Sequence, residues 1–237
     1  MTIYETYAAR SRVRAGVALK QRQSERLWRY GLAHSPGDAP RVLEIGPGDG
    51  GIAALCSEAG HPYVAVEGNE QVARTLRQRG LVVHQRYVPP LPDNLPQDFS
   101  CCFLLHVIEH MPSPVAAAQL LQEIRVALRP GGALVVACPD YLGWGTRFYD
   151  CDYTHTFPLT RRRLLGLLAD HGFQAVLDTT YSGAWFGTGS MLLSGLVRLV
   201  YPPLIDRLIG RHVPGDVLNR GALTFLPNLL AVAVKRA

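Results

Sequence analysis

Short apolar runs alternate with amphipathic stretches from Arg41 to the end of the chain. The runs are rich in β-branched residues and stop at turn-forming residues, as strands do, whereas the stretches between them repeat their apolar residues at helical spacing. Strands that alternate with helices predict an α/β protein with a parallel sheet covered on both faces. The predicted strands are 41–46, 63–69, 81–85, 99–106, 131–139, 173–181 and 228–237, and the predicted helices are 52–60, 71–80, 115–132 and 161–173.

The segment before the first strand follows a different pattern. Residues 1–38 carry apolar stripes at helical spacing among many arginines and end in Ser-Pro-Gly-Asp. An arginine-rich start also resembles a transit peptide, but Glu5 and Glu25 weaken that interpretation. We therefore expect an N-terminal helical lid over residues 1–38.

A second exception is the long connection 182–226, which exceeds any ordinary hairpin loop. Its apolar stretch is interrupted by arginines, prolines and an aspartate, so it cannot span a bilayer. We expect a helical cap insert here, while a homodimer surface and a peripheral contact with a membrane or lipid carrier through residues 190–210 remain open. The predicted core is then 39–181 together with 227–237.

Composition narrows the class of protein. The 237 residues are 48% apolar and 18% charged, which suits one α/β domain with a sizeable core. The net charge of +5 comes from scattered basic residues rather than a compact block, so we expect no nucleic acid partner. Five cysteines without a CxxC spacing, and no apolar leader at the start, predict reduced thiols in a cytoplasmic protein.

The glycine-rich stretch LEIGPGDGG at 43–51 follows the first strand and opens a helix. Gly46, Gly48 and Gly51 satisfy the GxGxxG spelling of a dinucleotide site, but this spelling alone is weak evidence. Glu44 stands two residues before the first glycine, where its carboxylate would repel a pyrophosphate. S-adenosylmethionine carries an ammonium and a sulfonium instead of phosphates, so an acidic neighbour suits it, although Glu44 could also cap the loop amides.

A second acid ends the second strand. Glu67 is placed to accept hydrogen bonds from ribose hydroxyls, as acids do at this position in nucleoside-binding sheets. The alternative is a surface turn residue in the sequence EGNE. Two acids at neighbouring strand ends favour the cofactor-binding interpretation.

The ordered motifs carry a resemblance. VLEIGPGDG, VAVEGNE, HVIEHMPSP, LRPGGALVVACP and HTFPLTRRRLLGLLADHGF resemble the successive motifs of class I S-adenosylmethionine-dependent methyltransferases from about Arg41 to Asp178, and NLLAVAVKRA resembles their last strand. The subgroup it most resembles contains bacterial small-molecule and glycan O-methyltransferases related to ubiquinone-biosynthesis enzymes. The resemblance implies a Rossmann-like seven-stranded sheet in the order 3-2-1-4-5-7-6, with the last strand antiparallel and helices on both faces.

The same resemblance implies a cofactor site for S-adenosylmethionine at the first, second and fourth strand ends. Many relatives place an aspartate after the third strand to hold the adenine amino group, whereas this chain has QRYVPPLPDN there. Tyr87 or Val88 is expected to make that contact through the backbone or by stacking. The residues expected to hold the cofactor are Glu44, Gly46, Pro47, Gly48, Gly50, Glu67, Gly68, Asn69 and His106.

The string HVIEH at 106–110 matches the HxxEH spelling of a zinc protease. That enzyme class needs both histidines on one regular helix, yet a strand precedes the string and prolines follow it. His106 is instead expected at the carboxyl end of the fourth strand, as a general base that activates an acceptor hydroxyl. Glu109 and His110 are expected to orient it, or to hold a divalent cation, since a related ExxEH arrangement in the quinone enzymes resembles a metal site; His110 could equally cap a helix or pack. We assign no metal ligands from the sequence.

A second polar cluster, DCDYTHTFPLT at 150–160, follows the fifth strand on the same sheet edge. Asp152 and His155 are expected to form an oriented acid–base pair, or else a loop that satisfies its own turns. Tyr141 and Trp144 are expected to line the acceptor pocket, although aromatic packing would also explain them.

These features predict a methyltransferase that acts on a hydroxyl of a small molecule, a sugar or a lipid-linked glycan. A quinone or phenol O-methyltransferase and a catalytically silent S-adenosylmethionine-binding scaffold are the alternatives. The chain has neither a basic stripe with interleaved aromatics nor an NPPY-like tetrapeptide, which argues against methylation of nucleic acid.

Overall fold

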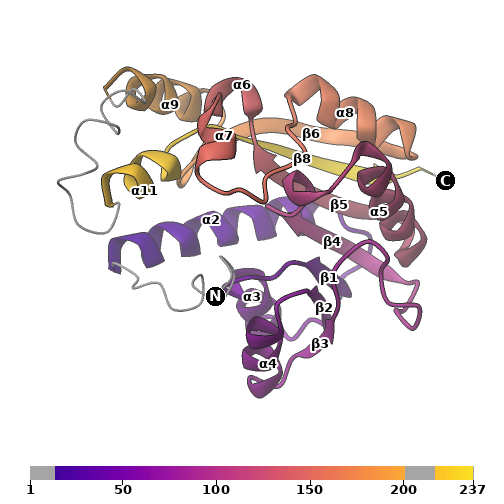
Figure 1. Cartoon of the computed structure of the whole chain (residues 1–237). Helices are drawn as coiled ribbons and strands as arrows, with labels where there is room; N and C mark the ends of the chain where they lie inside the picture. The colour runs from indigo at the N-terminus through magenta and orange to yellow at the C-terminus, as the bar shows by residue number, and fades with distance from the viewer. Residues whose placement is uncertain (1–13, 201–216, 237) are drawn as a thin grey trace.

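The computed structural model of the chain describes residues 14–200 and 217–236 (Figure 1). Predictions that concern residues 1–13 and 201–216, which belong to the expected lid and insert, lie outside these ranges. The described residues form one mixed sheet between layers of helices, so the predicted α/β class is confirmed.

The sheet runs in the order β3-β2-β1-β4-β5-β8-β6-β7. The strands β1 to β5 pair in parallel, and β8 is antiparallel to both of its neighbours, as expected. The difference from the expected seven strands is β7, a two-residue edge strand that is too short to produce an alternating pattern. The bounds are β1 Val42–Ile45, β2 Tyr63–Glu67, β3 Val82–Gln85, β4 Phe99–Leu105, β5 Leu128–Pro139, β6 Phe173–Ser182, β7 Trp185–Phe186 and β8 Asn228–Lys235.

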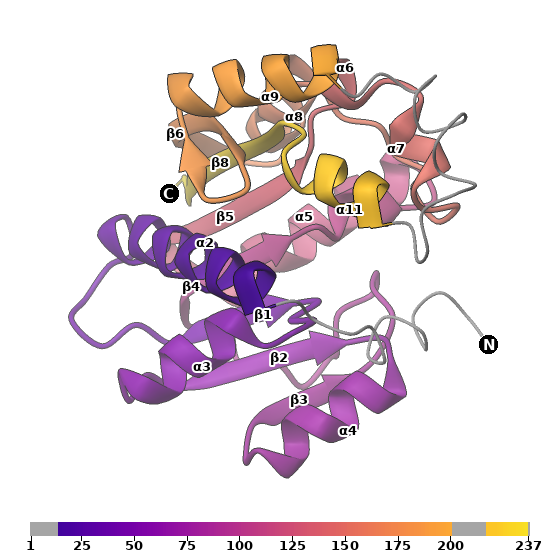
Figure 2. The same cartoon turned by 90° about the vertical axis from the view of Figure 1, so that its left-hand side faces the viewer.

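Helices cover both faces of the sheet (Figures 1 and 2). Several begin at the side chain of a polar N-cap residue that accepts a backbone N–H, as at Asn69, Ser113 and Thr160. The described helices are α2 Arg14–Ala33, α3 Gly51–Glu58, α4 Glu70–Gln78, α5 Pro114–Ala127, α6 Tyr141–Trp144, α7 Arg147–Asp150, α8 Arg161–Asp170, α9 Thr188–Val200 and α11 Val217–Thr224, with a short 3-10 helix η1 at Ile108–His110.

The helix predicted over 115–132 is wrong at its end. It stops at Ala127, and Leu128 already pairs with Phe99 as the first residue of β5. Pro130 cannot donate a backbone hydrogen bond and Gly131 has φ +71°, so neither residue continues a helix. The β5 strand is therefore longer than its apolar run.

The core consists of two apolar clusters on opposite faces of the sheet. One contains Leu43 and Leu104 with residues of α5 and α8, and the other contains Phe103 with residues of α2, α3 and α4. Neighbouring strand residues point to opposite faces, so the continuous apolar run of β4 supplies both clusters. Each fully buried side chain of this size contributes about 1.5–3 kcal/mol through its removal from water.

The α2 helix lies on one face of the sheet, against β4, β5 and α3 (Figure 2). Gly31 allows the close approach, because a Cβ built there would lie 2.6 Å from Cζ of Phe103. Trp28 stacks on the same ring at a centroid distance of 6.0 Å. At the other end of the contact, Lys20 forms a 2.8 Å ion pair with Asp49 of the glycine-rich loop. The helix thus connects the core to that loop.

The connection between β6 and β8 contributes β7, α9 and α11 to the structure. The α9 helix packs against β6 and β7, while several of its apolar side chains face outward. Among the described residues, none of the helices combines the length and the apolar character needed to cross a bilayer.

Candidate active site

The glycine-rich loop after β1 has an open, backbone-lined shape. Gly46, Gly48 and Gly50 have φ values of +68°, +50° and +75°, which are left-handed conformations that L side chains rarely adopt. A Cβ at Gly46 would lie 2.5 Å from Val107, whereas a Cβ at Gly48 would meet nothing nearer than 4.0 Å. The loop is therefore packed against Val107, just after β4, and has open space beside Gly48.

Glu67 at the end of β2 ties this loop to the next turn. Its Oε1 accepts the N–H of Asn69 at 2.7 Å, and its carboxylate also accepts the N–H groups of Gly48 and Gly68. Burial raises the pKa of Glu67, and these hydrogen bonds partly oppose the increase. The exposed side chain of Tyr87 lies beside this turn. Its ring is so close to Gly68 that a Cβ built there would lie 2.6 Å from it.

Glu44 lies in β1, two residues before the first glycine of the loop. The side chain is buried, and it accepts a hydrogen bond of 2.6 Å from the hydroxyl of Tyr63. Burial raises the pKa of Glu44 to about 7, while the Tyr63 hydrogen bond lowers it and the charge of Glu67 raises it further. The Glu44 carboxylate thus links β1 to β2 through Tyr63, and direct contact between this carboxylate and a cofactor stays a prediction.

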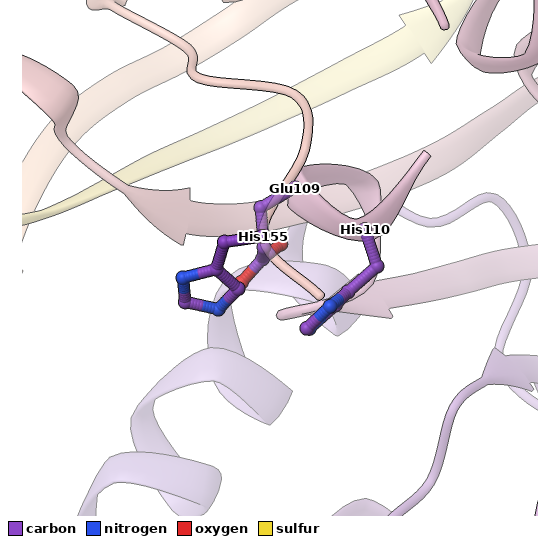
Figure 3. A group of neighbouring side chains, drawn as sticks. All are labelled: Glu109, His110 and His155. Atoms are coloured by element: carbon purple, nitrogen blue, oxygen red, sulfur yellow. The ribbon is translucent and has the colours of Figure 1, made fainter. Parts of the chain in front are cut away.

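Three side chains that the sequence analysis selected lie together beyond β4. Glu109 and His110 come from η1, and His155 comes from the loop that follows α7 (Figure 3). Two backbone hydrogen bonds join the loop to η1, since the N–H groups of Thr156 and Phe157 both donate to the carbonyl of Glu109. The 3-10 geometry of η1 also confirms that HVIEH does not form a regular zinc-protease helix.

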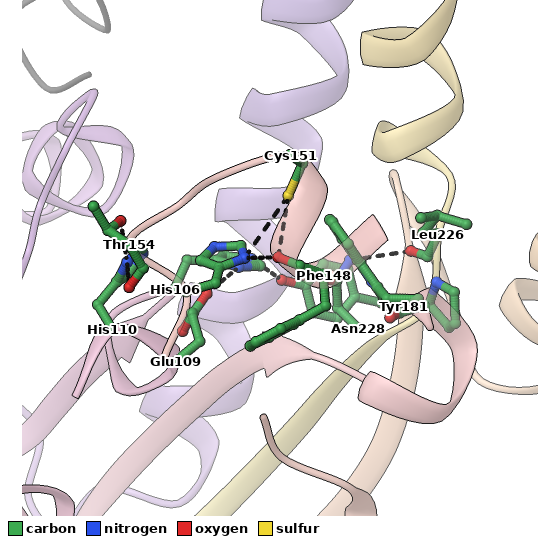
Figure 4. A network of polar contacts seen from close by, with 12 residues as sticks. His106, Glu109, His110, Phe148, Cys151, Thr154, Tyr181, Leu226 and Asn228 are labelled. Atoms are coloured by element: carbon green, nitrogen blue, oxygen red, sulfur yellow. Dashed lines mark hydrogen bonds and ion pairs between the residues drawn. The ribbon is translucent and has the colours of Figure 1, made fainter. Parts of the chain in front are cut away.

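His106 follows the last residue of β4 in a strained conformation. Its φ of +56° is the one left-handed value at a non-glycine residue in the described ranges. The ring lies between two partners, with Nδ1 3.2 Å from Oε1 of Glu109 and Nε2 2.6 Å from the hydroxyl of Tyr181 (Figure 4). The side chain is nevertheless 41% exposed, so one side of it remains accessible.

The partners of His106 assign its tautomer. Burial raises the pKa of Tyr181 far above its usual value, so the phenol keeps its proton and can donate it to Nε2. The Glu109 carboxylate can only accept, so Nδ1 donates to it. Burial alone would raise the pKa of Glu109, but the hydrogen bond with His106 and the charges of His106 and His110 lower it overall.

His110 is oriented by Thr154, which in turn bonds Asp152. Its Nδ1 lies 2.9 Å from the hydroxyl of Thr154, and that hydroxyl donates a 2.6 Å hydrogen bond to Asp152. The backbone N–H of Thr154 donates to the same carboxylate oxygen at 2.9 Å. Asp152 thus bonds Thr154 through Oδ1, as expected for a loop that satisfies its own turns, and the acid–base pair of Asp152 with His155 stays a prediction.

His155 is buried and bonds to the backbone instead. Its Nδ1 lies 2.7 Å from the carbonyl of Phe148, and its ring centroid is 4.8 Å from that of His110. Burial lowers the pKa of His155, although the Glu109 charge and the Phe148 hydrogen bond raise it. A neutral imidazole follows from this environment.

The two expected acceptor-lining aromatics are held by their neighbours. Trp144 donates its indole N–H to the carbonyl of Pro227 at 2.8 Å, and Tyr141 packs edge-on against Phe148 with ring centroids 5.7 Å apart. Both side chains are partly buried and fix the short helices α6 and α7 beside the site. Their contact with an acceptor stays a prediction.

Tyr181 is a site residue that the sequence analysis missed. It is the residue before the last in β6, which is parallel to β5 because β8 lies antiparallel between them. Its hydroxyl therefore reaches the same sheet edge as His106. Gln23 of α2 forms a further hydrogen bond with this phenol. The rule that ligands bind at carboxyl ends of strands would have pointed to Tyr181, had it been applied to the sixth strand.

Comparison with known proteins identifies the family. A family model described as a methyltransferase domain matches residues 9–177, well over half of the chain. A search of the curated proteins finds no match. The chain resembles the crystal structure of a SAM-dependent methyltransferase from Archaeoglobus fulgidus at 23% identity and a TM-score of 0.61, covering 90% of this chain and 94% of that one.

Two further solved structures have the same fold. A SAM-dependent methyltransferase from Methanosarcina mazei is 13% identical with a TM-score of 0.58, covering 86% of this chain and 96% of that chain. The [4+2]-cyclase SpnF is 14% identical with a TM-score of 0.61, over 92% of this chain and 81% of its own. Such identities show the fold alone, whereas the family model covers the loop, the acids and the histidines described above. The chain belongs to the S-adenosylmethionine-dependent methyltransferases.

Proposed function

We propose that this methyltransferase transfers the methyl group to a hydroxyl of a small molecule, a sugar or a lipid-linked glycan, with His106 as general base. The observation that carries the proposal is the position of His106. It stands at the end of β4, directly before Val107, which packs against Gly46 of the cofactor loop. A general base beside the loop that would hold the methyl donor can take the proton that an acceptor hydroxyl loses when it is methylated.

The residues of the loop fit S-adenosylmethionine. The left-handed glycines leave space at Gly48, and the Glu67 carboxylate at the next strand end supplies a hydrogen-bond acceptor beside it. The cofactor supplies an electrophilic methyl group on a cationic sulfur. The remaining tasks, which are to orient the acceptor and to take its proton, fall to the protein.

His106 is arranged for the second task. Its Nε2 carries the lone pair, and an acceptor hydroxyl can approach the exposed side of the ring and compete with Tyr181 for that lone pair. When Nε2 takes the proton, the imidazolium is stabilised through Nδ1 by the ionised Glu109 carboxylate. Glu109 and Tyr181 therefore act as positioning residues.

Two measurements test the proposed function. Isothermal titration calorimetry with S-adenosylmethionine and, separately, with NAD examines the cofactor, and binding of NAD alone would reverse the assignment. Transfer of labelled methyl groups to a panel of phenols, sugars, lipid-linked glycans and amines examines the acceptor. Methylation confined to the amines would overturn the hydroxyl assignment.

A variant pair examines the base. His106→Ala should lower kcat by about 10²–10⁴-fold while the Kd for S-adenosylmethionine changes less than about two-fold. His171→Gln is the matched control, because His171 bonds the carbonyl of Leu167 on α8 away from the loop. Unchanged turnover in His106→Ala would remove this residue from the mechanism.

The outer face of α9 supports a lipid-linked acceptor. Leu192 and Leu199 are 79% and 78% exposed, and Met191 and Leu196 are also exposed beside them. Long apolar side chains in water at one face of a helix are typical of a surface that meets lipid or another protein. We propose that this α9 face lies on a lipid surface, with the positive net charge of the chain favouring anionic headgroups.

Sedimentation with vesicles of phosphatidylcholine and phosphatidylglycerol tests the α9 proposal. The wild-type protein should pellet with the vesicles, and Leu192→Ser/Leu199→Ser should not. Val115→Ser/Val126→Ser on α5 is the control, since these valines are also exposed, at 76% and 53%, on another helix. If the leucines instead maintain a dimer in the absence of vesicles, the face is an interface between copies and the lipid proposal falls.

A further inference from the structure

We infer that Glu109, His110 and His155 form a binding site for a divalent transition-metal ion. One ligand atom of each residue lies within 4.8 Å of the others, and the three side chains lie side by side at the end of β4 (Figure 3). The set joins two imidazoles with one carboxylate from two separate segments, held together by backbone hydrogen bonds from Thr156 and Phe157 to the Glu109 carbonyl.

The carboxylate provides an independent observation. The Glu109 side chain is only 2% exposed, and its Oε2 has no hydrogen-bond partner in the described part of the chain. Its other oxygen, Oε1, is occupied by Nδ1 of His106. A buried carboxylate oxygen without a partner is costly, and coordination of a cation would satisfy it.

The hydrogen bonds of His155 place its lone pair on Nε2. The Phe148 carbonyl can only accept, so Nδ1 at 2.7 Å must be the protonated nitrogen. A metal-binding histidine characteristically donates its other ring N–H to a carbonyl or carboxylate in this way, which fixes both the tautomer and the ring orientation.

The same reasoning applies to His110 through a longer chain of contacts. The Thr154 hydroxyl gives its proton to Asp152, so it accepts from Nδ1 of His110, and the Thr154 carbonyl at 3.2 Å accepts from the same nitrogen. His110 therefore also carries its lone pair on Nε2. Asp152 acts behind Thr154 as an outer support for the site, which gives it a role other than the predicted pairing with His155.

The donor set indicates which ion fits. Two imidazoles and one carboxylate suit Zn²⁺ and its first-row neighbours, whereas Mg²⁺ and Ca²⁺ prefer oxygen ligands. Ligands at about 2.0–2.2 Å from an ion lie at most about 4.4 Å apart, so small side-chain rotations would close the set. Cys151 lies 3.7 Å from Nδ1 of His155, the nitrogen that donates to the Phe148 carbonyl, and not beside Nε2, so it is not counted as a ligand.

Three protein ligands leave an open coordination position, as in catalytic metal sites. Because Glu109 would hold the ion with Oε2 and His106 with Oε1, the ion and the base would share one carboxylate. Binding of the ion is independent of the proposed function. Its use, which is to hold an acceptor oxygen beside His106, rests on that function.

The experiment is a metal titration of untagged protein after removal of metals with a chelator, without cofactor or acceptor. Cobalt(II) chloride should bind one ion per chain and give the visible absorption of a low-coordinate N,O site, and zinc chloride should displace it. His110→Gln and His155→Gln should each weaken binding at least 100-fold, and Asp152→Asn should weaken it about 10–100-fold. His171→Gln, which removes the histidine at the C-cap of α8, should bind as the wild type does.

Folding is checked in each variant by circular dichroism and thermal unfolding, and the wild-type titration decides the question if the substituted proteins unfold. Absence of cobalt absorption and of zinc binding in the wild type would overturn the site, as would full affinity in folded His110→Gln and His155→Gln. Failure to bind S-adenosylmethionine would instead remove the proposed function and leave the metal result intact. Methylation that proceeds equally after chelation would remove the use of the ion in the reaction.

Discussion

At the scale of single residues, His106 shows how a strained position receives support. A left-handed φ at a non-glycine residue costs about 1–3 kcal/mol and persists only where its surroundings hold it. Here the backbone N–H of His106 donates to the carbonyl of Ala137, and both ring nitrogens have partners. These contacts hold the ring in one orientation before any acceptor binds.

Removal of the Tyr181 hydroxyl tests that support. Tyr181→Phe keeps the buried ring but removes the donor to Nε2, so the imidazole loses one of its two partners. We expect kcat to fall about ten-fold, with an unchanged Kd for S-adenosylmethionine and an altered pH profile of kcat. The pH profile distinguishes positioning from packing, because a purely structural residue would leave it unmoved.

Glu44 gives a pH dependence of stability with a defined sign. Its pKa is raised from 4.5 to about 7 in the folded state, so between these values the folded chain holds a proton that the unfolded chain has released. Unfolding therefore becomes easier as the pH rises from 4.5 to 7, by at most about 3 kcal/mol, and levels off above 7. Urea unfolding of wild type and Glu44→Gln at pH 5, 6, 7 and 8 measures this slope.

The Glu44→Gln variant should lack the slope, and Glu58→Gln at the exposed end of α3 serves as the control. Parallel curves for wild type and Glu44→Gln would show that the carboxyl ionises normally. The change leaves the Tyr63 hydroxyl with an amide oxygen to bond, so loss of packing does not dominate the comparison.

The sequence predicts site residues where charge and strand ends coincide, as at Glu67 and His106. It fails at Tyr63 and Tyr181, because a tyrosine in an apolar run is interpreted as packing and the partner of its hydroxyl comes from another segment of the chain. It left two interpretations of Asp152 open, because three residues of one loop can pair in several ways and only the fold selects Thr154. Residue types at strand ends are thus predictable, and their pairing is not.

At the scale of elements, α2 is held to the sheet by a close contact at one residue. A Cβ at Gly31 would lie 2.6 Å from Phe103 and 3.0 Å from Cys101, both of which are fully buried on β4. Overpacking of this kind costs about 1–3 kcal/mol and exceeds the gain in helix propensity. The helix that carries Lys20 and Gln23 to the site therefore depends on a glycine.

We expect Gly31→Ala to lower the free energy of unfolding by about 1–2 kcal/mol. Gly16→Ala is the matched control on the same helix, since a Cβ there meets nothing within 4 Å. It should raise stability by up to about 1 kcal/mol through helix propensity. Equal effects of the two substitutions in urea unfolding would mean that α2 can shift away from β4 without cost.

The helices and strands were predictable because their apolar periods differ, and their caps and glycines mark most boundaries. The end of α5 was not predictable, because the helical pattern of apolar residues continues through Leu128. Only the pairing of Leu128 with Phe99 of β4 shows that a strand begins there. The prolines after His110 argued against a regular helix but did not predict the 3-10 turn η1. The end of an element that is set by pairing with another strand cannot be predicted from the local sequence pattern.

At the scale of the whole molecule, alternation of strands and helices predicts a parallel sheet but does not order it. The strand order was an expectation from the resemblance, and the structure confirms it apart from β7.

We propose that 39–181 with 227–237 is a self-sufficient core and that the insert 182–226 serves the acceptor. Tyr181 pairs with Asn228 across antiparallel strands, so the two ends of the insert lie side by side.

Replacement of residues 183–226 by a short Asn-Gly turn tests this division. Directly opposed antiparallel residues lie about 5 Å apart, so a tight turn can join β6 to β8. The shortened protein should fold and bind S-adenosylmethionine with the wild-type Kd, while transfer to the acceptor is lost or its KM rises strongly. Loss of cofactor binding in a folded, shortened protein would show that the insert belongs to the core.

The place of β8 has a consequence for biosynthesis. This strand fills the gap between β5 and β6 with hydrogen bonds to both, although it comes after every other strand in the chain. While the ribosome is still translating, β5 and β6 each expose an unpaired edge, and these edges invite aggregation. In a nascent chain, the edges of β5 and β6 therefore stay exposed, or are covered by a chaperone, until Asn228–Lys235 has left the ribosome.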